Sequence, residues 1–160
     1  MRKFVFTFFI LGLLFTLVFR VEAAEKGMPR PTAKEKCPVC GMFVTKYPDW
    51  ISAVVFKDGS QAFFDGAKDL FIYLFDLKRF SPARKKEDIE VIWVLDYYSL
   101  SPIMAGKAWF VLGSDVFGPM GRELIPLETE SGAKEFLKDH KGKRILKFSE
   151  VIPEVIKTLD

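Results

Sequence analysis

The sequence predicts an α+β fold of two packed, related ββαβ units followed by a C-terminal helix. Signals for strand, strand, helix and strand occur twice in that order along the chain. In addition, GAKDLF at residues 66–71 is nearly repeated as GAKEFL at residues 132–137. A repeated segment inside a repeated order of elements indicates an internal duplication. Each unit of about 45 residues is too small to be stable alone, so we expect the two to pack together with a cleft between them.

The first unit is predicted to contain three strands rich in β-branched and aromatic residues, over residues 51–56, 61–64 and 89–95. Asp58-Gly59 is a strong signal for a tight turn between the first two strands. Asp65 is placed to cap a helix over residues 66–77, where apolar side chains recur at helical spacing. The third strand is expected to be buried on both faces near its middle.

The second unit shows the same order of signals, with two strands, a helix and a strand over residues 107–112, 124–127, 131–140 and 144–148. Residues 113–121 are rich in Gly and are predicted to form a long loop between its first two strands. Ser131 can cap the helix, and Lys141-Gly142 can stop it. A short C-terminal helix is predicted from Ser149, with Pro153 in its first turn, where proline is tolerated.

The first 23 residues predict a secretory signal peptide with a basic start, an apolar run and a small-residue cleavage site ending at Ala23. Arg20 is unusual before such a site, and the apolar run approaches the roughly 20 residues of a membrane span, so an uncleaved anchor is the alternative. Both interpretations place the remainder in the periplasm. Residues 24–36 predict a flexible tether. The folded domain is then expected over residues 37–160, with repeats at about 37–100 and 101–160.

The balance of charges excludes some classes of function. The whole chain has 24 Lys and Arg against 21 Asp and Glu, and the part after residue 23 is almost neutral. Nucleic acid is not an expected partner, because phosphate binding needs a clustered basic surface. The sequence has no recognisable Ser-His-Asp set, paired-carboxylate spacing or phosphate loop. We therefore do not expect an enzyme.

The stretch Cys37-Pro-Val-Cys-Gly-Met42 gathers both cysteines and one of the five methionines. Sulfur ligands favour Cu(I), Zn or iron–sulfur centres. Structural zinc usually takes four Cys or His ligands and an iron–sulfur cluster four cysteines, whereas the chain has two cysteines and one histidine, His140. Cu(I) is satisfied by two or three soft donors and makes use of Met42. A Cu(I) site is therefore the leading prediction, with poor binding of Zn(II).

The same spacing also fits a disulfide or a redox CxxC pair. A thioredoxin-type pair opens a helix, whereas the sequence after Cys40 is more typical of a strand or turn. A redox pair would show a lowered thiol pKa. An inert domain with a structural disulfide is a third interpretation. His140 lies at the end of a predicted helix, where its side chain interacts favourably with the helix C-terminus, and this explains it without a metal. Met28 could reach a metal only if the tether folds back.

Four segments, in order along the chain, resemble the NosL family, the accessory copper proteins of nitrous-oxide reductase. They are CPVCGMFV, FDGAKDLF, DYYS and GSDVFGPMGRELIP, which begin at Cys37, Phe64, Asp96 and Gly113. The resemblance implies two related ββαβ units in a secreted or lipid-anchored protein. It also implies delivery of Cu(I) for assembly of the copper sites of the reductase. Many members carry a lipobox cysteine that this sequence lacks, so a lipid anchor is not expected.

The resemblance also implies a set of ligands. The Cys-x-Met of the family falls on Cys40 and Met42, and its loop methionine falls on Met120. Cys37 is not a fixed feature, so its role stays open as an extra ligand, a redox partner or a bystander. The implied function is a metallochaperone that hands Cu(I) to a periplasmic apo-enzyme, with a membrane copper exporter or assembly proteins as further partners. The alternative is a thiol–disulfide oxidoreductase that uses Cys37 and Cys40.

Overall fold

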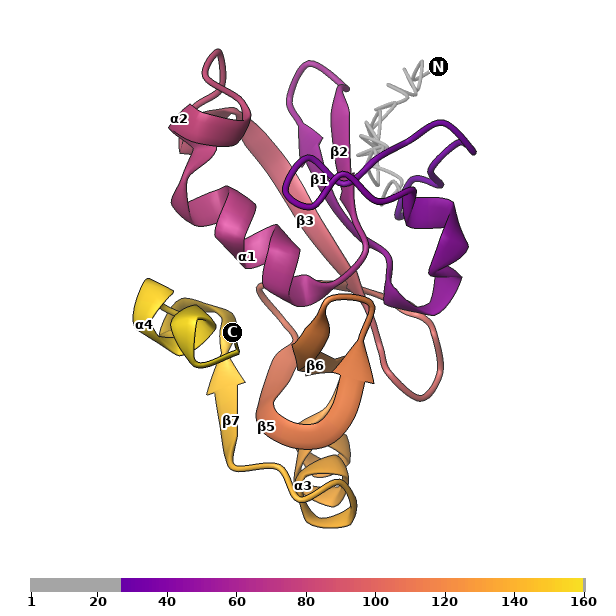
Figure 1. Cartoon of the computed structure of the whole chain (residues 1–160), viewed down its shortest axis with the longest axis vertical. Helices are drawn as coiled ribbons and strands as arrows, with labels where there is room; N and C mark the ends of the chain where they lie inside the picture. Colours follow the sequence, from indigo (N-terminus) through magenta and orange to yellow (C-terminus); the bar gives the residue numbers. More distant parts are fainter. Residues whose placement is uncertain (1–26, 160) are drawn as a thin grey trace, which may run out of the picture.

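A computed structural model describes residues 27–159, so the predicted signal peptide lies outside the described residues. The described chain forms two antiparallel sheets, each with a helix packed against it, and a short C-terminal helix (Figure 1). The predicted α+β class is thereby confirmed. Within residues 27–159, no helix combines the length and apolar character needed to cross a membrane.

The first sheet has the strand order β2-β1-β3-β4. Its strands are β1 (Ser52–Phe56), β2 (Gln61–Phe64), β3 (Ile89–Leu95) and β4 (Pro102–Met104). The turn between β1 and β2 contains Gly59 at a φ of +83°, a left-handed conformation that glycine adopts without strain. The strand signals thus predicted this hairpin correctly. The strand β4 was not predicted, because three residues are too few to show an alternating pattern.

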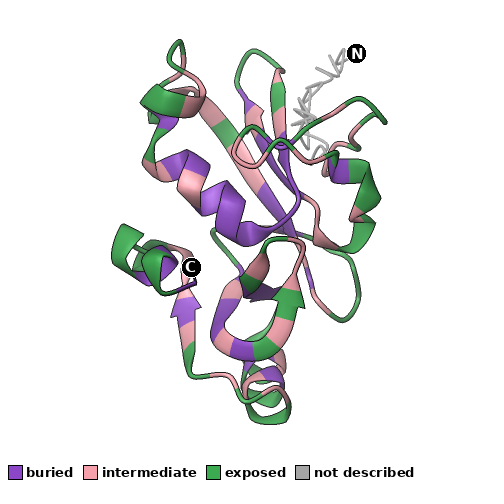
Figure 2. Cartoon of the chain, viewed as in Figure 1, coloured by how far each residue is buried: buried purple, intermediate pink, exposed green. Residues whose placement is uncertain are grey.

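Helix α1 (Ala67–Phe75) is almost wholly buried, since it lies between the first sheet, the second sheet and α4 (Figure 2). It is followed by α2 (Leu77–Phe80) rather than continuing as one helix to residue 77. The predicted cap is wrong, because Gly66 holds the N-cap position and no side chain caps it. Asp65 faces a cysteine instead. Short 3₁₀ helices complete the described chain at Val44–Lys46, Pro48–Trp50, Lys86–Asp88, Phe148–Glu150 and Lys157–Leu159.

The second sheet has the strand order β6-β5-β7. Its strands are β5 (Trp109–Gly118), β6 (Gly121–Leu127) and β7 (Arg144–Lys147). The prediction of a long loop over residues 113–121 is wrong, because the strands continue to a tight turn at Gly118–Gly121. The register of β5 and β6 shifts between Leu112 and Phe117, where Gly113 has a φ of +77°. Glycine here marks an irregularity within a strand, which sequence alone does not distinguish from a loop.

Helix α3 (Glu130–Asp139) covers the second sheet, and the C-terminal helix α4 (Pro153–Ile156) is present but begins at Pro153 rather than at the predicted Ser149. Thr129, not Ser131, caps α3, because its hydroxyl accepts from the Gly132 amide at 3.0 Å. The repeated segments do not occupy the same place in their helices: Gly66 precedes the first residue of α1, whereas Gly132 is the third residue of α3. The two units therefore correspond better in the order of their elements than in the positions of the two similar sequence segments.

The two units share one main core. Buried side chains from the first sheet and α1 are continuous with side chains from the second sheet, among them Phe110, Leu124 and Leu146. A smaller cluster, which includes Ile125 and Phe136, lies under α3. Because each unit alone would bury little apolar surface, this shared core explains why the two pack together.

Candidate metal centre

The segment Cys37–Met42 folds into a tight turn, which we call the sulfur turn. The Cys37 amide donates to the Met42 carbonyl at 2.9 Å, and the Gly41 amide donates to the Cys37 carbonyl at 2.9 Å. Gly41 has a φ of +78°, a conformation that favours glycine. An isolated antiparallel β-bridge pairs the backbones of Lys36 and Phe43 and closes the turn. Both cysteines are free thiols, so the structure does not contain the alternative disulfide.

Two carboxylates meet the two thiols of the sulfur turn. The Cys37 thiol donates to Asp69 Oδ2 at 3.2 Å, and the Cys40 thiol donates to Asp65 Oδ1 at 3.2 Å. One ligand atom from each of these four residues lies within 4.8 Å of the others. Cys37, Asp65 and Asp69 are buried, whereas Cys40 is half-buried. An incoming group therefore meets Cys40 first.

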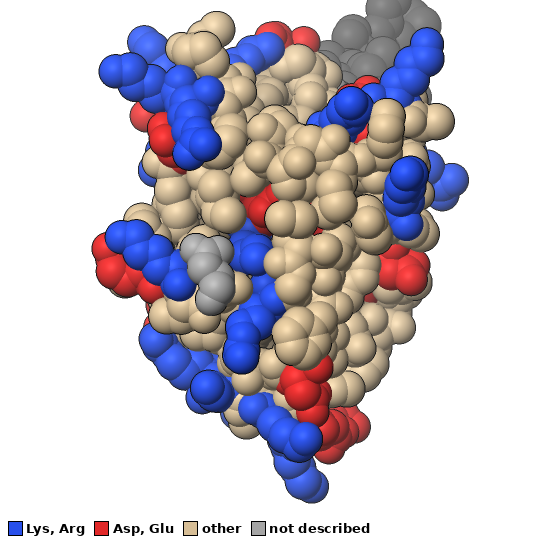
Figure 3. Space-filling view, viewed as in Figure 1, with Lys and Arg blue, Asp and Glu red and all other residues tan. Residues whose placement is uncertain are grey.

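The sequence analysis missed both carboxylates. Asp65 directly follows β2 and Asp69 lies in the first turn of α1, four residues later. This spacing suits one face of a helix start. Asp65 was interpreted as a helix cap because aspartate is common there. Near the middle of the face shown in Figure 3, acidic atoms appear only as a small spot, next to basic atoms. Asp65 and Asp69 are only 1% and 3% exposed, so both carboxylates belong to the interior.

Burial governs the protonation of the cluster. Removal from water raises the pKa of the Cys40 thiol to about 12, against the opposing effect of the Met42 amide. Burial raises the pKa of the Cys37 thiol further, against the opposing effects of the Cys40 and Val39 amides. Burial likewise raises the pKa of Asp69. A thiol–disulfide enzyme needs a lowered thiol pKa, so these protonated thiols count against that alternative.

The structure gives the two predicted methionine ligands different surroundings. Met42 is half-buried, and its sulfur accepts from the Tyr47 hydroxyl at 3.6 Å. Met120 is 43% exposed at the tight turn between β5 and β6. Its carbonyl accepts from Lys68 Nζ at 2.8 Å, and Lys68 directly precedes Asp69 in α1. The fold therefore brings the turn that carries Met120 within reach of the Lys68 side chain at the start of α1. Coordination by either thioether stays a prediction.

Glu123 of β6 connects the second unit to the same helix end. Its buried carboxylate accepts from the Lys68 amide at 2.5 Å and from the Leu124 amide at 2.9 Å. A side chain at Gly66 would collide with this carboxylate, so glycine permits the close approach. Burial raises the pKa of Glu123 from 4.5 to about 8.

Glu123→Gln is expected to flatten the pH dependence of stability of the metal-free protein. Because the pKa of folded Glu123 lies above its ordinary value, its stabilising contribution is complete below about pH 4.5 and lost as pH rises through about 8. Glutamine keeps a neutral acceptor at every pH. Thermal unfolding between those limits should show a falling Tm for wild type and a smaller fall for the variant. The exposed Glu154→Gln should follow wild type, and an equal fall in all three proteins would contradict this role.

Other candidates lie apart from the cluster. His140 ends α3, where its Nδ1 lies 3.4 Å from Asp115 and its ring stacks on Phe136. Asp96 accepts backbone amides from its own turn and from Glu128 at 2.8 Å, which gives it a structural role.

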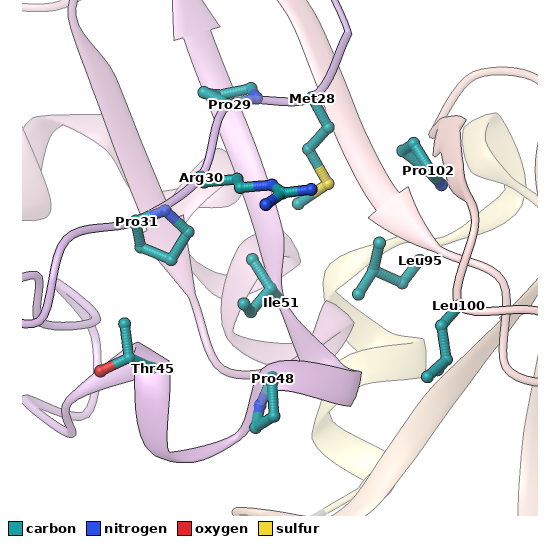
Figure 4. Close-up of a pocket in the computed structure, with 10 residues that line it drawn as sticks. All are labelled: Met28, Pro29, Arg30, Pro31, Thr45, Pro48, Ile51, Leu95, Leu100 and Pro102. Atoms are coloured by element: carbon teal, nitrogen blue, oxygen red, sulfur yellow. The ribbon is translucent and has the colours of Figure 1, made fainter.

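Met28 also lies outside the cluster. It packs against the main core and lines a cavity of about 400 Å³ with apolar residues such as Ile51 and Leu95 (Figure 4). Neither cysteine lines this cavity. Within the predicted tether, Met28 is thus packed on the domain, but not at the thiols.

A turn with two free thiols, set on an antiparallel α+β domain beside buried carboxylates, is a candidate metal centre of a small protein. The chain belongs to the NosL family, whose model matches residues 29–156. The resemblance stated from the sequence is thereby confirmed.

Known relatives agree with this assignment. The chain is 28% identical over 130 residues to the copper-binding lipoprotein NosL of Stutzerimonas stutzeri, a match covering 73% of this chain and 62% of that protein. It thus spans about three fifths of the length of that relative. The crystal structure of the copper chaperone NosL from Shewanella denitrificans superposes with a TM-score of 0.68 at 24% identity, covering 81% of this chain and 98% of the other. That likeness shows the fold.

Proposed function

We propose that the protein is an extracytoplasmic metallochaperone that binds Cu(I) and delivers it to a copper enzyme, with nitrous-oxide reductase as the acceptor. The observation that carries the proposal is the pair of free thiols in the sulfur turn, since thiolates are the preferred protein ligands of Cu(I). Membership of a family with relatives named for copper binding and copper chaperoning supports the same cargo. Residues 1–23 would export the chain to the periplasm.

In this proposal Cu(I) is held by Cys40, Met42 and Met120, with Cys37 as a further donor. Cys40 is half-buried and is the ligand that an acceptor approaches. An incoming thiolate, thioether or imidazole can bind the ion beside Cys40 before a donor leaves. Transfer then needs only ligand exchange. The thiols lose their protons on loading, because the thiolate is the form that binds the metal.

Anaerobic titration against a chromophoric Cu(I) chelator tests the proposed binding. We expect one Cu(I) per chain, and we expect the loaded protein to unfold at a higher temperature because the ion binds only the folded state. Failure to compete with a weak chelator would overturn the proposed function.

Met120→Leu tests whether the hairpin between β5 and β6 supplies a ligand. Leucine keeps the volume and removes the sulfur, so the Tm of the metal-free protein should change little. We expect a lower Cu(I) affinity and a smaller gain in Tm on loading. Met104→Leu, on the half-buried strand β4, makes the same exchange away from the sulfur turn and should leave both quantities unchanged. If Met120→Leu binds Cu(I) as tightly as wild type, Met120 has a packing role and the site is confined to the sulfur turn.

A further inference from the structure

The proposed Cu(I) function leaves the two buried carboxylates at the sulfur turn without a role as ligands. Cu(I) prefers soft sulfur donors and has little need of carboxylate oxygen. Yet Asp65 and Asp69 are buried, and each accepts the S–H group of a different cysteine at 3.2 Å. The prediction of poor zinc binding rested on a shortage of ligands. With these carboxylates the site offers four donors, so the shortage does not exist.

The separations of the four donors suit a tetrahedral ion. Zn–S bonds of about 2.3 Å and Zn–O bonds of about 2.1 Å place tetrahedral ligand atoms roughly 3.4–3.8 Å apart. The two thiol–carboxylate pairs are at 3.2 Å, and all four ligand atoms lie within 4.8 Å of one another. Shifts within the reach of side-chain adjustment would therefore enclose the ion.

The sulfur turn itself supports the same ion. Two residues separate Cys37 from Cys40, a spacing that is common in zinc-binding turns. The backbone hydrogen bonds from the Cys37 amide to the Met42 carbonyl and from the Gly41 amide to the Cys37 carbonyl fix the turn that carries both thiols. These features are independent of the carboxylates.

Charge also favours a divalent ion. When all four groups act as ligands they carry four negative charges, and the buried Glu123 lies at the same helix end. Lys68 is the one basic residue buried in the described part of the chain, and its ammonium group is directed to the Met120 carbonyl. A divalent cation offsets more of this buried charge than Cu(I) does, and desolvated charges need such compensation.

We propose that Cys37, Cys40, Asp65 and Asp69 form a tetrahedral site with two sulfur and two oxygen ligands for a borderline divalent cation such as Zn(II). This site shares its thiols with the proposed Cu(I) site but does not rest on it, because the carboxylates serve only the divalent ion. Cu(I) and Zn(II) then compete for one pair of thiols, and Cu(I) displaces Zn(II) from them.

Anaerobic titration with Co(II), a spectroscopic substitute for Zn(II), tests the proposal on the full chain after signal removal. Wild type should bind one Co(II) with a sulfur-to-cobalt charge-transfer band and the intense visible bands of tetrahedral cobalt, and Zn(II) should abolish both. X-ray absorption of the zinc-loaded protein should show two sulfur and two oxygen neighbours. A six-coordinate cobalt spectrum without the charge-transfer band, or a zinc shell without sulfur, would overturn the proposal with no variant needed.

The double variant Asp65→Asn, Asp69→Asn separates the two metals. We expect its Co(II) affinity to fall by about 100-fold or more, since even indirect partners of metal ligands are worth about 10–100-fold. Its Cu(I) affinity should fall far less than its Co(II) affinity, because the soft thiol donors are intact. Asp139→Asn makes the same exchange on the exposed end of α3 and should bind both metals normally. Unchanged Co(II) binding by the double variant would overturn the site, whereas Co(II) binding without Cu(I) binding in wild type would overturn the copper function alone.

Discussion

Cys40→Ser is expected to lower the Cu(I) affinity by about 100-fold or more, which corresponds to about 2.8 kcal/mol of binding free energy. Serine offers a hard oxygen in place of the soft sulfur of the most accessible thiol. Its hydroxyl can still donate to Asp65, so the fold and the Tm of the metal-free protein should be kept. Anaerobic competition with a chromophoric chelator measures the affinity. A variant that binds Cu(I) as tightly as wild type would exclude Cys40 as a ligand.

Cys37→Ser is the matched comparison, since it makes the same exchange at the more deeply buried of the two cysteines. Cys37 is only 1% exposed, and its thiol is paired with Asp69. If both thiols bind the ion, the two variants should lose affinity to a similar degree. If Cys37 is a bystander, only Cys40→Ser should weaken binding. This comparison decides the role that the sequence left open.

The apparent Cu(I) affinity is expected to rise steeply with pH. The pKa of Cys40 is raised to about 12 and that of Cys37 is raised still further, so both thiols are protonated in the metal-free protein at neutral pH. Binding must release these protons, because the thiolate is the ligand. Each released proton increases the apparent affinity about tenfold per pH unit, so two protons give about 100-fold.

Chelator competition between about pH 6 and pH 8, corrected for the protonation of the chelator, measures this dependence. Proton release into a weakly buffered solution gives an independent count. Cys40→Ser should lose about one unit of the slope of log affinity against pH. A flat profile in wild type would mean that the thiols are already ionised, contrary to the effect of their burial.

Sequence patterns predicted the first unit well where local signals are strong. The strands Gln61–Phe64 and Ile89–Leu95 were predicted at their observed bounds, since apolar and β-branched runs end at clear turn signals. The hairpin between β5 and β6 was mistaken for a loop. Its glycines lie at an irregularity in the strand register and at a tight turn. A loop and an irregular hairpin can have the same local glycine content, so composition does not distinguish them.

The candidate site was only half predictable. Cys37 and Cys40 are three positions apart and carry soft donors, so their pattern indicated a metal site, with a disulfide or a redox pair as alternatives. Asp65 and Asp69 lie far downstream, and only the packing of α1 behind the sulfur turn places them at the thiols. Spacing could not have connected them, because aspartate near a helix start has a common structural explanation. Met120 is a predicted ligand through the family resemblance alone, and the fold brings its backbone to Lys68.

Copper transfer tests the central claim most directly. The Cu(I)-loaded protein is mixed anaerobically with apo nitrous-oxide reductase and an excess of chelator that holds free Cu(I) constant, and copper in the separated reductase is measured over time. We predict that the reductase gains copper faster than from the chelator alone, and that Cys40→Ser removes the difference. Equal rates with and without the protein, or copper that stays on the protein, would contradict its role as a metallochaperone for this acceptor.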